Sequence, residues 1–215
     1  LGFAGQHTGP AMGDVTMSLD AAWADRRMRT TAAAMAENRQ HLIDLDRDIG
    51  DADHGENMDR GFSAVVEKLD AEGTPATPGE VMKLAAMTLM SKVGGAAGPL
   101  YGTAFLRAAT AAGQAPDLEP ETLVTVLAAA RDGIVARGKA EVGDKTMVDA
   151  WTPAVEAAQT AAGASASPAE VLAAAANGAR AGLSGTEPLI ARKGRASYLG
   201  ERSAGHLDPG AASTV

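Results

Sequence analysis

The chain has 215 residues, a length typical of one domain, and a formal net charge of −8 at pH 7, which argues against nonspecific binding to nucleic acid or to an anionic membrane. It contains no cysteine, which excludes disulfides and thiolate metal sites and fits a reducing compartment. No apolar run approaches the roughly 18 residues that a membrane span needs. We therefore expect a cytoplasmic protein that binds neither nucleic acid nor a membrane.

Residues 1–17 are rich in glycine and lack helical periodicity, and they have neither the basic start nor the apolar core of a signal peptide. We expect them to form a flexible leader. Residues 18–215 contain no stretch that resembles a linker and are expected to form a single domain. The first helix of this domain is predicted to begin near Ser18, a good N-cap residue, and to run towards Leu45.

Further helices are predicted from apolar spacing and from start signals. Residues 77–80 read TPGE, in which the threonine caps the helix, the proline takes its first position and the glutamate completes a capping box. Residues 167–170 repeat this device as SPAE. The predicted helices span about 57–71, 78–92, 100–112, 120–138, 147–162 and 168–181. No alternating strand pattern occurs, so the sequence predicts an all-α fold with seven or eight helices.

Residues 45–62 contain an unusual concentration of charge. Five polar side chains fall within nine residues: Asp46, Asp48, Asp51, Asp53 and His54. Carboxylates this close repel one another unless a cation lies among them, and magnesium takes oxygen ligands of this kind. Gly50 and Gly55 permit sharp turns, and in an extended turn Asp51 and Asp53 would point the same way. An acidic surface loop without a metal explains this stretch equally well by itself.

Two further stretches carry signals for anion binding. Residues 93–102, VGGAAGPLYG, place small residues before a helix, where free backbone N–H groups can bind an anion. A tight connection between alanine-rich helices has the same composition. Near the C-terminus the basic residues cluster: Arg192, Lys193, Arg195 and Arg202. They either compensate phosphate charge or form a solvated loop.

Another helix start, residues 143–147, contains Lys145, which could face phosphate or solvent, and we favour solvent. An acidic metal site, a glycine turn and a basic segment are together the equipment of phosphoryl transfer. The chain has no P-loop motif GxxxxGK[ST].

Four long segments are similar to the motifs of one family. They read IGDADHGENMDRGF, GGAAGPLYGTAF, GDKTMVDAWTPA and ARKGRASYLGERSAGHLDPGA. In this order they resemble the ADP-binding L subunits of phosphotransferase-system-dependent dihydroxyacetone kinases, the DhaL family, from about Ser18 to Ser213. The resemblance implies a barrel-like bundle of about eight antiparallel amphipathic helices with a nucleotide site at one end.

The resemblance also implies the site residues. Two Mg²⁺ ions would be held by three metal ligands, Asp46, Asp51 and Asp53. Nucleotide contacts would come from His54, Gly55, Glu56, Asn57, Ala97, Gly98, Gly138, Met147, Arg195, Asp208, Pro209 and Gly210. None of these residues is expected to act as a catalytic acid or base, because the family works by positioning metal and nucleotide.

The activity implied is that of a phosphotransferase subunit. ADP stays bound as a cofactor and is phosphorylated by a phosphohistidine on a phosphotransferase subunit, with phosphoenolpyruvate as the ultimate donor. The resulting ATP passes its phosphoryl group to dihydroxyacetone on the K subunit. L subunits can also act on a transcription regulator. Two alternatives stay open: the nucleotide domain of an ATP-dependent dihydroxyacetone or fatty-acid kinase, and a module that binds a regulator according to its nucleotide state.

The chain departs from the family pattern in two places. Ala97 stands where the family usually has serine, so backbone donors would have to replace one hydroxyl contact to phosphate. The chain also stops at Val215, soon after the segment that opens the last helix of the family. A bundle without that helix, or with a shortened one, is expected to expose apolar faces.

Overall fold

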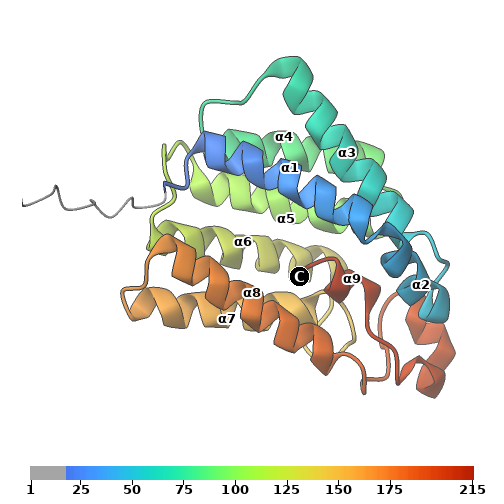
Figure 1. Ribbon diagram of the computed structural model, residues 1–215. Coiled ribbons are helices and arrows are strands. Elements are labelled where there is room, and N and C mark those ends of the chain that lie inside the picture. The colour runs from blue at the N-terminus through green and yellow to red at the C-terminus, as the bar shows by residue number, and fades with distance from the viewer. Residues whose placement is uncertain (1–17) are drawn as a thin grey trace, which may run out of the picture.

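The computed structural model describes residues 18–215, and the leader predicted for residues 1–17 lies outside this range. Nine α-helices and one 3₁₀ helix occur within the described residues, with no β-strand among them (Figure 1). The α-helices are α1 Ala21–Glu37, α2 Arg39–Ile49, α3 His54–Glu72, α4 Pro78–Lys92, α5 Ala97–Ala112, α6 Pro120–Gly138, α7 Val148–Gly163, α8 Pro168–Gly185 and α9 Pro209–Ala212. The 3₁₀ helix η1 spans Arg195–Ser203. The predicted all-α class is confirmed.

The capping signals in the sequence mark real helix starts. At α4 the Thr77 hydroxyl accepts a hydrogen bond from the Glu80 N–H at 3.2 Å, and the Glu80 carboxylate accepts one from the Ala76 N–H at 3.0 Å. At α8 the Ser167 and Glu170 side chains form a reciprocal capping box. Helices α4 and α6 have the predicted bounds, whereas α8 continues to Gly185, beyond the predicted end at residue 181.

The prediction of one long first helix was wrong. Helix α1 begins after Asp20, whose carboxylate caps it by accepting from the Trp23 N–H at 2.8 Å. Asn38 then separates α1 from α2, and its side-chain amide donates to the Ala34 carbonyl at 2.9 Å. Asparagine interrupts helices in this way because its side chain competes for backbone groups. The break lets α2 turn away from α1 towards one end of the bundle (Figure 1), and α2 carries Asp46 there.

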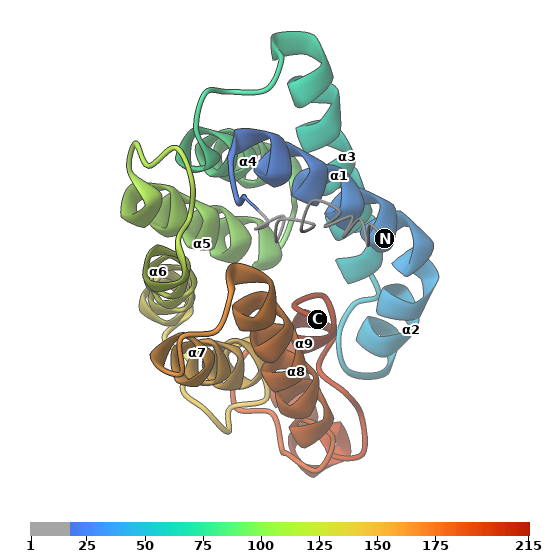
Figure 2. The ribbon, with the colours of Figure 1, turned by 60° about the vertical axis from the view of Figure 1, so that its left-hand side comes forward.

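The helices surround a common interior. From α3 to α8 each helix packs on the next, and α1 packs on α3 and α4. In Figure 2 they form an open ring, in which α8 does not pack on α1 as the consecutive helices pack on each other, and the short α9 contacts α2, α7 and α8. The core contains few aromatic residues: Phe62 is 2% exposed and meets Phe105 edge to face, with ring centroids 6.2 Å apart. This arrangement is the predicted barrel-like bundle.

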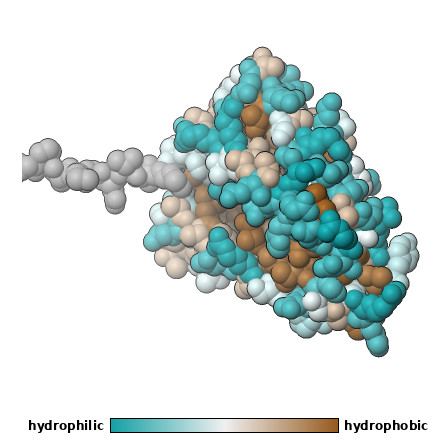
Figure 3. Space-filling view, turned by 45° about the vertical axis from the view of Figure 1, so that its right-hand side comes forward, coloured by the Kyte–Doolittle hydropathy of each residue, from teal (hydrophilic) through white to brown (hydrophobic). Residues whose placement is uncertain are grey.

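Apolar side chains also line a cavity of about 260 Å³ on the inner side of the ring. Its wall includes Trp23, Met28, Phe105, Leu127 and Trp151, and it reaches Val215. Apolar side chains are also visible from outside, where they gather on the face drawn in Figure 3. None of the helices in residues 18–215 is both long and apolar enough to cross a membrane.

Small residues allow α7 and α8 to approach closely. A Cβ atom added at Gly178 would lie 2.3 Å from the Pro153 carbonyl oxygen, and one at Gly182 would lie 2.1 Å from the Asp149 carbonyl oxygen. Side chains at these two positions would therefore push the helices apart. Since Asp149 lies at the start of α7, this contact also sets the position of the loop before it.

We predict that Gly178→Ala lowers the free energy of unfolding by roughly 1–3 kcal/mol, because the methyl group overpacks the α7–α8 contact. Gly163→Ala is the matched control, since a Cβ atom there would have no atom from the surrounding structure within 4 Å, apart from its chain neighbours and its own helix backbone. It should be neutral or stabilising by up to about 1 kcal/mol, as expected for alanine in a helix. Urea denaturation of both variants measures the difference, and equal stabilities would contradict the close packing.

Candidate functional site

A cavity of about 580 Å³ lies at the end of the bundle where α2 ends and α3, α5 and α7 begin. Segments that are far apart in the sequence meet in its wall. Twelve residues predicted for the site line it: Asp46, Asp51, Asp53, His54, Asn57, Ala97, Gly138, Met147, Arg195, Asp208, Pro209 and Gly210. The four motifs of the sequence therefore converge on one hollow.

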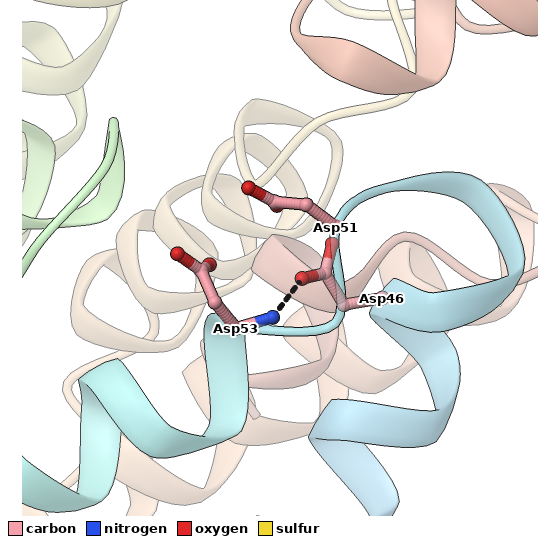
Figure 4. A group of neighbouring side chains, drawn as sticks. All are labelled: Asp46, Asp51 and Asp53. Carbon is pink, nitrogen blue, oxygen red and sulfur yellow. Dashed lines mark hydrogen bonds between the residues drawn. The ribbon is translucent and has the colours of Figure 1, made fainter.

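The three predicted metal ligands form a tight group. Asp46, Asp51 and Asp53 each offer a carboxylate oxygen, and these oxygens lie within 4.8 Å of one another. Asp46 is buried, and its Oδ2 accepts hydrogen bonds from the N–H groups of Asp53 at 2.8 Å and His54 at 3.1 Å. The carboxylates of Asp51 and Asp53 are exposed and point to the same side (Figure 4). Three hard oxygen donors this close suit a divalent cation such as magnesium.

The backbone between these aspartates is unusual. Ala52 has a φ of 62°, which is left-handed and costs a non-glycine residue about 1–2 kcal/mol. The sequence argument assumed an extended turn, but this left-handed residue is what brings Asp51 and Asp53 together. Gly50 is required for a different reason, since a Cβ atom there would lie 2.0 Å from Asp46 Oδ1. The site is thus held in a strained turn, as functional sites often are.

The N-termini of two helices, α3 and α5, lie at the same cavity. The N-cap residues Asp53 and Ala96 make no side-chain capping hydrogen bond, although Asp46 Oδ2 accepts from the first N–H of α3, that of His54. Backbone N–H groups in such a first turn attract anions, because they lack intrahelical partners and lie at the positive end of the helix dipole. Gly98 is needed in the α5 turn, since a Cβ atom there would lie 2.2 Å from the Val93 carbonyl oxygen. The arrangement suits phosphate groups beside the carboxylates.

Part of the cavity wall is apolar. Leu100, Ile134, Met147 and Val148 line it, together with Gly138 at the end of α6. A Cβ atom at Gly138 would lie 3.1 Å from Leu100 Cδ2, so glycine keeps this side open. An apolar slot next to an anion site is the combination that a nucleotide requires, with its flat base and its charged phosphates.

Three predicted nucleotide contacts are not part of the cavity wall among the described residues: Gly55, Glu56 and Gly98. The Glu56 carboxylate is exposed and pairs with Arg39 at 2.8 Å. Gly55 packs against α2, where a Cβ atom would lie 2.1 Å from the Arg39 carbonyl oxygen. Gly55 and Gly98 lie in the first turns of α3 and α5. The helix face that carries each glycine packs against the protein and not against the cavity.

The wall also contains residues that the sequence analysis did not assign, among them Arg137 and Lys145. No sequence pattern singles out Arg137, which belongs to the last turn of α6. The expectation that Lys145 faces solvent was wrong, since the residue is only 1% exposed. Its backbone is left-handed, with a φ of 62°. Its Nζ donates to backbone carbonyls of residues 186, 187 and 206.

Charges around the cavity are partly compensated. Arg195 Nε lies 2.9 Å from Asp51 Oδ2, so the basic segment reaches the carboxylate group. Burial lowers the pKa of His54, although the Asp46 and Asp53 carboxylates oppose this shift. Its ring nitrogen Nε2 lies 2.8 Å from the Ser213 hydroxyl. His54 is therefore a neutral residue at pH 7 that links α3 to the end of α9.

Asp208 is the most strongly perturbed acid. Its carboxylate caps α9 by accepting from the Ala211 N–H at 2.7 Å. Its pKa is raised from 3.8 to about 7, chiefly by burial and further by the nearby carboxylates of Asp149 and Asp46, against the Ala211 hydrogen bond and Lys145, which lower it. The start of α9 thus presents an acid that is half protonated near neutral pH.

Comparison with known proteins identifies the family. The family model described as DAK2 domain matches residues 48–215. The ADP-binding subunit DhaL of the PEP-dependent dihydroxyacetone kinase of Escherichia coli (strain K12) is 51% identical over 176 residues, which cover 82% of this chain and 83% of that protein. The chain belongs to the DhaL family of DAK2-domain proteins.

Another DhaL protein is similar over nearly its whole length. The ADP-binding subunit DhaL of PEP-dependent dihydroxyacetone kinase 1 of Listeria innocua serovar 6a is 46% identical over 199 residues, or 93% of this chain and 94% of that protein. In fold, the chain is similar to the crystal structure of the dihydroxyacetone kinase from C. freundii in complex with AMP-PNP and Mg²⁺, with a TM-score of 0.67 and 23% identity. That match covers 99% of this DhaL chain but only 35% of the kinase.

We predict that Asp208→Asn changes how stability depends on pH. Between pH 4 and 7 the folded protein binds more protons at Asp208 than the unfolded chain, so the free energy of unfolding falls as the pH rises. Asparagine retains a capping oxygen but does not titrate. The stability of the variant relative to wild type should therefore rise across this window, by up to about 1.4 kcal/mol per pH unit, and level off above pH 7. Urea denaturation without nucleotide or metal measures it, and a constant difference would contradict the assignment.

Proposed function

We propose that this protein is the nucleotide-binding subunit of a dihydroxyacetone kinase and holds Mg–ADP as a resident cofactor. The observation that carries the proposal is the meeting of three carboxylates with the N-termini of two helices, α3 and α5, whose N-cap side chains make no capping hydrogen bond, in one cavity. Asp46, Asp51 and Asp53 would hold magnesium, and two ions would bridge them to a diphosphate. The bound metal would neutralise charge on the phosphate oxygens, as phosphoryl transfer requires.

The residues of the chain have positioning roles in this proposal. The N–H groups in the first turns of α3 and α5, apart from that of His54, which donates to Asp46, would bind phosphate oxygens. Ala97 would contribute its backbone and no hydroxyl. The apolar slot around Met147 and Gly138 would receive the adenine. Arg195 lies on the carboxylate group and is placed to balance charge near the phosphates. No side chain is needed as an acid or base, because the attacking group belongs to another subunit.

The phosphotransferase-dependent class is favoured over the ATP-dependent one. Relatives at 51% and 46% identity are named as ADP-binding subunits of PEP-dependent kinases. The kinase with AMP-PNP is only 23% identical. We therefore propose that a phosphohistidine subunit phosphorylates the bound ADP and that a separate K subunit holds dihydroxyacetone. The cytoplasmic location and the action on a transcription regulator stay predictions from the sequence.

Reconstitution tests this assignment. The purified protein, a K subunit and the phosphotransferase proteins are mixed with phosphoenolpyruvate, dihydroxyacetone and Mg²⁺. Dihydroxyacetone phosphate should form without added nucleotide, because ADP remains bound through purification and turnover. A strict requirement for stoichiometric ATP, together with rapid ADP exchange, would instead support the ATP-dependent class.

The metal assignment is tested by Asp51→Ala and Asp53→Ala. Each variant loses a ligand, so its Mg²⁺-dependent affinity for ADP should fall by more than about 100-fold, beyond the loss typical of an outer-shell partner. Helicity should persist, because the Asp53 side chain does not cap α3. The matched control is Asp48→Ala, whose exposed carboxylate lies 3.4 Å from the His206 ring and outside the cavity wall. Titration calorimetry with and without Mg²⁺ measures the effect, and unchanged affinity in either ligand variant counts against the site.

A further inference from the structure

Lys145 occupies an unusual position for a lysine. It is 1% exposed and lies in the turn before α7. Its Nζ donates to the carbonyl oxygens of Thr186 at 2.7 Å and Glu187 at 3.3 Å, and also to that of His206. An ammonium has three donors, and all three are used on backbone carbonyls. No carboxylate in residues 18–215 lies within ion-pair distance of it.

The three carbonyls flank one segment of the chain, residues 188–205, which we call the basic loop. Thr186 and Glu187 precede the loop and His206 follows it, so one ammonium holds both of its ends. The Gly205 N–H adds a hydrogen bond to the Glu187 carbonyl at 2.8 Å. The Arg192 N–H donates to the Asp144 carbonyl at 3.0 Å, next to Lys145 in sequence. The loop is therefore closed at its neck and attached to the turn that carries Lys145.

The basic loop and the residue after its neck both reach the nucleotide cavity. Lys193, Gly194 and Arg195 contribute to the cavity wall from within the loop, and Arg195 pairs with Asp51. Asp208 lies two residues beyond His206 and begins α9 at the same wall. A shift at the neck would move both of these wall segments, because neither is part of the main helical ring.

An apolar side chain of the same length would fill this space without burying a charge. Burial of an ammonium is unfavourable unless its donors are satisfied, and burial lowers the pKa of Lys145 while the carboxylates of Asp208, Glu187 and Asp149 oppose this change. An apolar side chain could not donate hydrogen bonds. The ammonium donates to carbonyl oxygens at both ends of the loop at the same time.

We propose that Lys145 is a positioning residue, which clamps the neck of the basic loop so that Arg195 and the start of α9 face the phosphate end of the cavity. This inference rests on the proposed nucleotide site and adds to it a residue whose ammonium group is bonded to backbone carbonyls. Its role is to hold the loop in the nucleotide-free protein before any ligand binds.

Trypsin is a suitable probe, because the basic loop contains four cleavage sites: Arg192, Lys193, Arg195 and Arg202. Lys145→Met is nearly isosteric and removes the charge, so native-state cleavage within the loop should accelerate at least about tenfold, as expected when charge-assisted hydrogen bonds are lost. Lys145→Arg keeps the charge and should remain closer to wild type. Lys83→Met, at an exposed position on α4, is the matched control and should be cut as wild type is. Cleavage of Lys145→Met at the wild-type rate would overturn the clamp.

Affinity for Mg–ADP tests the positioning role separately. Calorimetry should give a Kd for Lys145→Met roughly tenfold above that of wild type and a Kd for Lys83→Met equal to it. An unchanged Kd in Lys145→Met would overturn the positioning role even if the loop were cut faster. If the wild-type protein itself fails to bind Mg–ADP, the proposed function is wrong, while the trypsin result still decides the clamp.

The wild-type protein provides a test that does not depend on a variant folding. Brief acetylation of the native protein with acetic anhydride, followed by mass spectrometry, reports the reactivity of each lysine. Lys145 should react at least about tenfold more slowly than Lys83, since its Nζ is buried and fully bonded. Equal reactivity of Lys145 and Lys83 would overturn the proposal.

Discussion

Mutual repulsion among Asp46, Asp51 and Asp53 is the constraint around which this end of the bundle is built. Two unit charges about 4 Å apart repel by roughly 1 kcal/mol in water and by several times that near a protein surface. The protein opposes this repulsion with N–H donors to Asp46 and with the Arg195 guanidinium at Asp51. These contacts hold the carboxylates in place, but the exposed oxygens of Asp51 and Asp53 remain available for a cation.

The helical ring supports this group by bringing helix ends together. Helices that pack through glycine and alanine approach closely, as α7 and α8 do at Gly178 and Gly182. Close packing lets the starts of α3, α5 and α7 and the ends of α2 and α6 share one small cavity. The positive N-terminal ends of α3 and α5 then lie beside the three aspartates. The aspartates attract cations, and the helix N-termini attract anions.

Residues 183–215 complete the cavity by a different kind of structure. After α8 ends, they contain only a 3₁₀ helix and the four-residue α9. The backbone hydrogen bonds of such short helices do not fix where this segment lies on the bundle. Buried polar side chains do so instead: Lys145 bonds the loop neck, Ser203 accepts from the Ala191 N–H at 2.8 Å, and Asp208 caps α9. Such interactions are strong because water is excluded, and they leave little freedom in where the segment lies.

Local signals in the sequence determined much of this protein. Capping residues and apolar spacing located α4 and α6, and the resemblance to the family named twelve residues that line the cavity. The acidic cluster was also evident, because it depends on residue type and short spacing. Only the tertiary structure decided the break at Asn38, the left-handed turn at Ala52, the outward position of Glu56 and the burial of Lys145. Each of these depends on partners distant in sequence or on a backbone conformation that no local pattern encodes, since a side chain's direction follows from what the rest of the fold packs around it.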